Sequence, residues 1–138
     1  INISNGGVKR SFSKDGVTGY IYEEYPRGNL NGVLNGYITA IIGIYELSKV
    51  DESFYDLFND NILNLKRILP LYDTGYWSYY ALDGNLDSGF YHRYIITQLD
   101  SLSEIDSDFC YYSDLFSKYR DQIPNQIKAF YNKVKYKL

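Results

Sequence analysis

From residue 33 to the C-terminus, apolar side chains recur at helical spacing, and this pattern limits the chain to a mainly helical fold. In residues 33–49 they fall three or four positions apart and share one wide face: Val33, Leu34, Tyr37, Ile38, Ile41, Ile42, Tyr45 and Leu47. Asn31 is expected to cap this helix, Pro70 to end the next one, and Pro124 to lie in the first turn of the last. The further helices are predicted over 51–69, 90–105, 108–121 and 124–136.

Residues 1–25 are predicted to be extended. Two runs rich in β-branched and aromatic residues, 8–12 and 17–22, flank the dipeptide Asp15-Gly16, which is a turn signal. Pro26 then biases the preceding residue toward extended geometry and ends this segment. The predicted fold class is therefore mainly α, built of helical hairpins with a short N-terminal β-hairpin.

The length of 138 residues predicts a single domain over residues 1–138, large enough for its own core. The chain contains no methionine, so we expect it to be processed or cut from a longer protein. Its N-terminus has neither the basic nor the apolar region of a secretory signal, and no apolar run reaches 18 residues. The sequence predicts no membrane span and leaves the compartment open.

Composition excludes several classes of function. A net charge of −3 gives no basic footprint for nucleic acid. One cysteine and one histidine exclude a disulfide framework and a Cys-based or His-rich metal site. Asp83, Asn85 and Asp87 alternate as in a calcium loop, but the expected Gly and closing Glu are absent, which favours a plain solvated loop. No metal site is predicted.

Tyrosine is the over-represented residue, with 17 copies. Its phenol can donate or accept a proton in catalysis, and its ring stacks on sugars. Tyrosines on helical stripes are predicted to pack in the core or at its boundary: Tyr37, Tyr45, Tyr55, Tyr119 and Tyr131. For the three loop tyrosines that lie near Glu24, Asp73 or His92, packing and chemistry stay equally open: Tyr25, Tyr80 and Tyr91.

Four motifs, in this order, resemble the C-terminal domain of D-glucuronyl C5-epimerases. They are Glu23-Glu24-Tyr25-Pro26, Val33-Leu34-Asn35-Gly36-Tyr37, Leu69-Pro70-Leu71-Tyr72-Asp73-Thr74-Gly75, and Tyr91-His92 with Gln98-Leu99. The stretch 42–47 is also similar to the first helix of that family. The resemblance covers about residues 20–120.

This resemblance implies an incomplete α/α toroid and an isomerase that converts glucuronic to iduronic acid within a heparan-type polysaccharide. It implies removal and return of the proton on C5, no dissociable cofactor, a uronic-acid-containing polysaccharide as partner, and a homodimer in the parent protein. The family's catalytic positions fall on Glu24, Tyr25, Tyr80 and Tyr91. The neighbouring motif residues are expected to bind substrate: Asn35, Tyr72, Asp73 and His92.

Two positions depart from the family pattern. The family has an arginine in a Tyr-Asp-Leu-Arg run, where this chain has Tyr80-Ala81-Leu82-Asp83, and Ile95 stands in place of a second histidine. Arg27 and Arg93 are the candidate replacements for the cation that holds the substrate carboxylate. The basic residues of the last helix are predicted to form only a solvated face: Lys128, Lys133, Lys135 and Lys137.

Two alternatives therefore stay open. A related lyase would remove the same C5 proton and then eliminate the group at C4. A glycan-binding or structural module would keep the helical fold without the chemistry.

Overall fold

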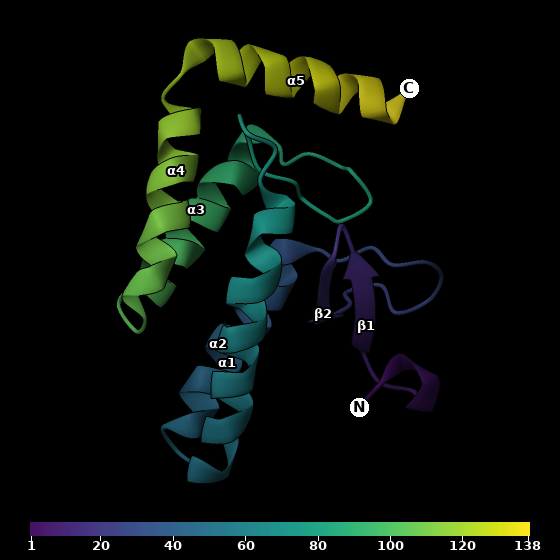
Figure 1. Cartoon of the computed structure of the whole chain (residues 1–138), viewed down its shortest axis with the longest axis vertical. Coiled ribbons are helices and arrows are strands. Elements are labelled where there is room, and N and C mark those ends of the chain that lie inside the picture. Colours follow the sequence, from purple (N-terminus) through teal and green to yellow (C-terminus); the bar gives the residue numbers. More distant parts are fainter. The chain divides into compact units, whose positions relative to one another are not determined.

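A computed structural model describes all 138 residues and confirms a mainly helical fold with an N-terminal hairpin (Figure 1). The chain divides into two compact units, residues 1–71 and 72–138. Each unit is described by itself, and their action as a single domain stays a prediction. None of the helices has the length and apolar character that crossing a bilayer requires.

The hairpin of unit 1 pairs β1 (Lys9–Lys14) with β2 (Val17–Tyr22) in antiparallel register. Asp15 and Gly16 form the connection with φ angles of 50° and 79°. Both central residues of a tight hairpin turn need positive φ, which Asp tolerates and Gly adopts freely. The predicted Asp-Gly turn is confirmed.

Two helices complete unit 1: α1 (Leu34–Ser48) and α2 (Tyr55–Ile68), both within the predicted ranges. The α2 helix ends two residues before Pro70, in a short 3₁₀ turn. The expected cap was wrong: Val33 occupies the cap position of α1, and no side chain caps the helix there. The helix gains its stability from its buried apolar face rather than from a cap.

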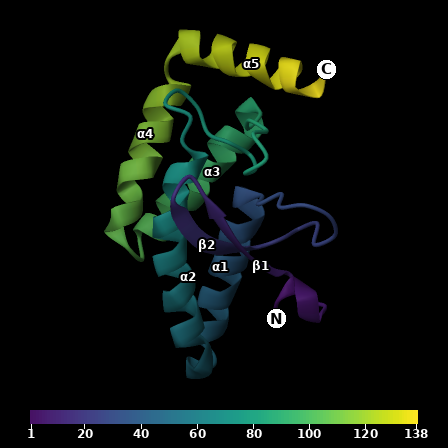
Figure 2. The same cartoon turned by 45° about the vertical axis from the view of Figure 1, so that its right-hand side comes forward.

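The hairpin lies against one side of the α1–α2 pair (Figure 2) and is fixed there by two buried asparagines. Asn64 accepts a hydrogen bond from the Tyr20 amide at 3.0 Å and donates to the Tyr20 carbonyl at 2.8 Å. Asn64 also donates to the Tyr37 hydroxyl, which in turn donates to Asn61. Gly19 is required beside this network because a Cβ there would lie 2.4 Å from the Cγ2 methyl of Ile68.

Unit 2 contains α3 (Gly89–Ser103), α4 (Cys110–Arg120) and α5 (Ile123–Lys137). The α3 and α4 helices pack side by side, and α5 leaves the end of α4 in a new direction (Figure 1). Pro124 lies in the first turn of α5, as predicted.

The loop that precedes α3 is ordered by its own hydrogen bonds. Thr74 Oγ1 accepts from the Trp77 amide and donates to the Trp77 carbonyl, both at 2.8 Å. Isolated antiparallel bridges join Asp73 to Ser78 and Tyr79 to Leu86. The loop therefore holds its aromatic side chains in fixed positions.

The tyrosines of the helices divide into packed and exposed ones, and helical spacing predicted only part of this division. Tyr37 is completely buried, and Tyr45 packs on Phe58 with ring centroids 5.0 Å apart, so packing is confirmed for both. Tyr55 and Tyr131 are 57% and 66% exposed, so the prediction of core or boundary packing was wrong for them. Each lies on the solvent-facing side of its helix.

Candidate functional site

In unit 1, the first glutamate of the Glu-Glu-Tyr-Pro motif holds the loop together. Glu23 is buried, and its carboxylate accepts from the backbone amides of Asn31 at 3.1 Å and Gly32 at 3.0 Å. It also forms an ion pair with Arg10 at 3.0 Å. Because Glu23 is occupied within the fold, only the second glutamate is presented at the surface.

Glu24 is that exposed residue, and it lies against the first turn of α1. A Cβ on Gly36 would be only 2.2 Å from Glu24 Oε1, so the glycine provides the space for this carboxylate. Partial burial raises the pKa of Glu24. The neighbouring Tyr25 is 63% exposed, and Arg27 is also exposed.

Asn35 follows at the start of α1 and is half-buried. Its backbone carbonyl accepts from Thr39 Oγ1 at 2.8 Å. Unit 1 thus places four of the predicted site residues on one loop and the helix turn that follows it: Glu24, Tyr25, Arg27 and Asn35.

In unit 2, the loop before α3 and the first turn of α3 bring together two predicted catalytic tyrosines. The ring centroids of Tyr80 and Tyr91 are 5.0 Å apart, with the ring planes inclined at 64°. Both side chains are half-buried. The ammonium of Lys133, from α5, lies 5.5 Å from the Tyr80 ring centroid.

A chain of three buried polar side chains lies next to this pair along the sequence. Ser78 Oγ is 2.5 Å from Asp87 Oδ2 and 2.6 Å from His92 Nδ1. His92 Nε2 lies 3.0 Å from the Phe116 carbonyl oxygen. The ring also stacks on Trp77 with centroids 3.7 Å apart. All members of the chain are buried, so it is not an exposed nucleophile of the Ser-His-Asp type.

Hydrogen counting limits this chain to two protonation states, one with a neutral His92 and a protonated Asp87 and the other with both groups charged. His92 Nε2 must carry a hydrogen because it faces a carbonyl oxygen, so Nδ1 of the neutral ring accepts from Ser78. In that neutral state the hydroxyl hydrogen of Ser78 is used and a protonated Asp87 donates to Ser78; when both groups are charged, Ser78 donates to Asp87 instead. Burial raises the pKa of Asp87 to about 7 and lowers that of His92 to about 4, which agrees with a protonated Asp87 and a neutral His92.

The other predicted substrate-binding residues of unit 2 have mixed exposure. Tyr72 is completely buried. Asp73 is half-buried and accepts from the Tyr119 hydroxyl at 3.1 Å. Burial, followed by the Asp73 charge, raises the pKa of Tyr119 to about 12. Arg93 is exposed on the first turns of α3.

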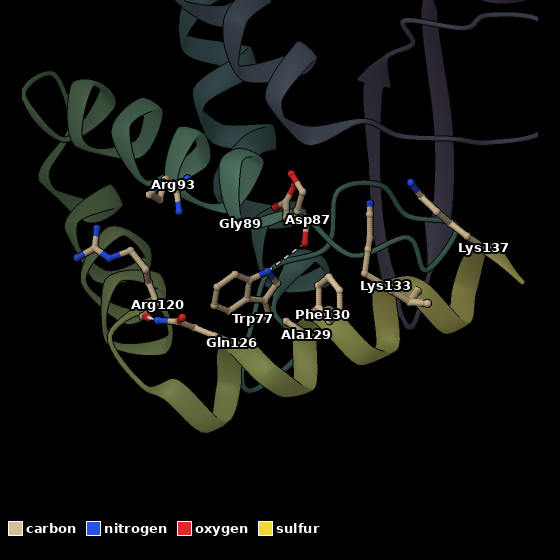
Figure 3. A pocket seen from close by; sticks show the side chains of 12 residues that line it. Trp77, Asp87, Gly89, Arg93, Arg120, Gln126, Ala129, Phe130, Lys133 and Lys137 are labelled. Atoms are coloured by element: carbon tan, nitrogen blue, oxygen red, sulfur yellow. Dashed lines mark hydrogen bonds between the residues drawn. The ribbon is translucent and has the colours of Figure 1, made fainter.

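A pocket of about 440 Å³ lies between the loop that carries Trp77 and Asp87 and the helix α5 (Figure 3). Lys133 lines it and donates to Asn85 Oδ1 at 2.7 Å and to the Leu86 carbonyl. Partial burial lowers the pKa of Lys133. Lys133 is thus shared between this pocket and the ring of Tyr80.

Sequence reasoning missed Ser78, Asp87 and Lys133 as functional candidates. The loop over residues 83–87 was expected to be solvated, but Asp87 is only 2% exposed, and the expectation was wrong at this position. The solvated-face prediction was also wrong for Lys133, which turns toward the loop. A useful signal was present at Trp77-Ser78 and Leu86-Asp87, where a polar residue follows a large apolar one on each side of the same loop.

Comparisons with known proteins agree with the motifs. The family model described as the D-glucuronyl C5-epimerase C-terminus matches residues 1–123. A D-glucuronyl C5-epimerase of Caenorhabditis elegans is 34% identical over 96 residues, which cover 59% of this chain and 15% of that protein.

An uncharacterized protein of Methanocaldococcus jannaschii is 29% identical over 103 residues, which cover 72% of this chain and 33% of that protein. The chain therefore spans about a third or less of the length of either relative.

Proposed function

The chain belongs to the family of the D-glucuronyl C5-epimerase C-terminus, and we propose on this premise that it acts as a uronyl C5-epimerase domain in the protein that contains it. The substrate is a uronic-acid-containing polysaccharide, in which glucuronic acid is converted to iduronic acid. The observation within the structure that best supports this proposal is the contact between Tyr80 and Tyr91, with ring centroids 5.0 Å apart.

The proposed reaction is an isomerisation that removes one proton and returns one. A phenolate or carboxylate base takes the proton from C5, and the electron pair of the C–H bond moves toward the adjacent carboxylate to give an enediolate-like intermediate. A neutral phenol on the opposite face then donates its proton to C5. The sugar leaves with inverted configuration, and no oxidant, reductant or leaving group is needed.

In unit 2, Tyr80 and Tyr91 are proposed to act together on one face of the sugar, because their rings are in contact and leave no room for a sugar between them. Lys133 places a positive charge beside this pair, since its ammonium lies 5.5 Å from the Tyr80 ring centroid. The buried chain of Ser78, Asp87 and His92 holds the loop and the first turn of α3 that carry the two tyrosines. His92 is therefore proposed to position Tyr91 rather than to touch the sugar.

In unit 1, Glu24 and Tyr25 are the further proposed groups. A glutamate with a raised pKa is a stronger base than a fully solvated one, and Gly36 leaves room for it beside α1. The exposed phenol of Tyr25 is open to a ligand.

The family arginine that follows the Tyr80 position is absent, so another cation must balance the substrate carboxylate. Arg27 and Arg93 are exposed, and Lys133 is already placed near Tyr80. We also propose, from the family alone, an incomplete α/α toroid, a homodimer in the parent protein and no dissociable cofactor.

A glycan-binding module without chemistry is the second candidate, and the run Tyr80-Ala81-Leu82-Asp83, which lacks the family arginine, favours it. The test is deuterium incorporation at C5 of an unsulfated glucuronate-containing polysaccharide in heavy water, measured with the protein that contains this chain. Exchange without chain cleavage supports the epimerase. An unsaturated product that absorbs in the ultraviolet indicates the lyase, and binding without exchange indicates the module.

A further inference from the structure

The pocket beside α5 combines an apolar wall with a concentration of positive charge. Trp77 and Phe130 line it together with smaller apolar groups of α5, as Figure 3 shows. Four basic residues also line it: Arg93, Arg120, Lys133 and Lys137. The chain as a whole carries −3, so this cluster is a local exception to the charge of the protein.

Asp87 is the one acidic residue of the lining, and its Oδ2 is engaged by Ser78 in the buried chain that ends at His92. Burial raises the pKa of Asp87 to about 7, so its charge offsets only a small part of the four positive charges. Its second carboxyl oxygen, Oδ1, is buried and has no hydrogen-bond partner in the chain. A buried polar atom without a partner is rare in proteins and favours a site where a ligand supplies the missing hydrogen.

The positive groups of the lining are partly engaged within the chain. Arg120 donates through Nε to Asp121 Oδ1 at 2.9 Å, which uses one of its five hydrogens. Lys133 uses two of its three ammonium hydrogens, on Asn85 and Leu86.

The Arg93 guanidinium lies beside the start of α3, with Nη1 3.6 Å from the position of a Cβ on Gly89. Backbone amides at the start of a helix add to the attraction of a negative charge. An anion here therefore meets guanidinium, ammonium and helix-terminal groups together.

We propose that this pocket binds an anionic sugar unit, through its carboxylate or sulfate, next to the unit that Tyr80 and Tyr91 handle. The proposal rests on the proposed function for its choice of a uronic-acid polysaccharide as ligand. It goes beyond that function because it assigns a second binding position. The residues of α5 that build the pocket lie after residue 123, where the family match ends. The α5 wall of the pocket therefore lies outside the stretch that the family model matches, while Arg93 and Arg120 lie within it.

Each part of such a ligand has a matching group. The apolar face of a sugar ring fits the wall formed by Trp77 and Phe130. The anionic group pairs with Arg93 and Arg120, whose planar guanidinium groups suit carboxylate and sulfate. Lys133 connects this subsite to Tyr80, since it contacts both.

The test is calorimetric titration of the 138-residue chain with two tetrasaccharides, one of alternating glucuronate and N-acetylglucosamine, the other N-sulfated. A third, carboxyl-reduced and neutral, is the ligand control. The double variant Arg93→Gln/Arg120→Gln is expected to raise Kd about tenfold. Lys118→Gln, an exposed charge change on α4 away from the pocket lining, is expected to leave Kd unchanged.

Tighter binding of the N-sulfated ligand identifies sulfate as the preferred anion, and equal or weaker binding identifies the carboxylate. The proposal is overturned if neither charged ligand binds, if the neutral ligand binds as well, or if the double variant binds like the wild type. Circular dichroism of the double variant excludes loss of fold as the cause.

Deuterium exchange at C5 separates this proposal from the function on which it rests. Binding in the pocket without exchange leaves the subsite standing and removes the epimerase. Exchange at C5 without binding in the pocket supports the epimerase and overturns the subsite.

Discussion

Each unit buries a network of polar side chains, and the two networks differ in whether they can gain or lose a proton. In unit 1, Asn61, Asn64 and Tyr37 connect the hairpin to the helices through amide and phenol groups. Burial raises the pKa of Tyr37, so the network stays neutral at all ordinary pH values. In unit 2, Asp87, Ser78 and His92 share hydrogens that titrate.

This difference predicts which of the two buried networks responds to pH. The network of unit 1 only fixes the position of β2, and it does so in one protonation state. The network of unit 2 joins the loop of Trp77 to α3, and it lines a basic pocket through Asp87. A change of proton count there alters charge beside the proposed sugar-binding groups, so pH should act on the buried network of unit 2 and not on that of unit 1.

The largest expected effect is on the pH dependence of unit 2 in Asp87→Asn. The raised pKa of Asp87 makes folding less favourable as pH rises from about 4 to 7, because the folded state holds a proton that the unfolded state has lost. The lowered pKa of His92 acts in the opposite direction between about 4 and 6.5. The two effects nearly cancel in the wild type.

Asparagine still offers a hydrogen-bond donor to Ser78 but does not titrate. In the network of the variant, only the titration of His92 therefore makes the free energy of unfolding depend on pH. The free energy of unfolding of the variant, minus that of the wild type, should grow by about 4 kcal/mol from pH 4 to pH 8, which is the Asp87 contribution that the substitution removes. Hydrogen exchange of α3 amides measures it. Asp114→Asn, on the exposed side of α4, is the control and should follow the wild type. Parallel profiles for Asp87→Asn and the wild type would contradict the titratable network.

Asn64→Ala should destabilise unit 1 by about 3 kcal/mol, equally at pH 5 and pH 8. The change leaves the Tyr20 amide and carbonyl without their partners and removes a donor to Tyr37. Hydrogen exchange of β2 amides gives the measurement. Asn59→Ala, half-buried in the same helix, is the matched control with a small effect. A loss that varies with pH would end the contrast between the two units.

Gly36→Ala should lower C5 exchange about tenfold while leaving stability unchanged or slightly increased. Alanine favours the helix, but its Cβ displaces the Glu24 carboxylate, which lies 2.2 Å from that position. Gly43→Ala, with open space around it in the same helix, provides the control for helix propensity. Equal exchange rates for the two variants would show that the position of Glu24 does not matter.

The smallest effect is expected from Tyr55→Ser and Tyr131→Ser, one in each unit. Both side chains are mostly exposed, so each change should alter the free energy of unfolding by less than about 0.5 kcal/mol. Thermal unfolding detects a larger change, which would mean that an exposed tyrosine is covered in solution.

The sequence was sufficient for the elements of the fold because their signals are local. Apolar spacing placed α1 through α5, and Asp15-Gly16 placed the hairpin turn. It was insufficient for Asn64, Asp87 and Lys133, whose roles depend on partners far away in the chain. From the sequence alone, a polar residue in a helix or loop is predicted to be exposed, because a hydrogen-bond partner far away in the chain cannot be identified.

The candidate catalytic set came from motifs, and its members are still a prediction. The structure adds the contact between Tyr80 and Tyr91, which lie eleven positions apart and carry no sign of proximity in their spacing. It also separates Glu23 from Glu24, since only the first is used to hold the loop.

The most direct test of the account is the rate of deuterium incorporation at C5 of glucuronate in heavy water, compared among the wild type, Tyr80→Phe and Tyr91→Phe. Phenylalanine keeps the ring contact and removes only the hydroxyl, so the fold should be retained. The account predicts exchange by the wild type and a loss of at least about 100-fold in each variant. No exchange by the wild type, or wild-type rates in both variants, would contradict it.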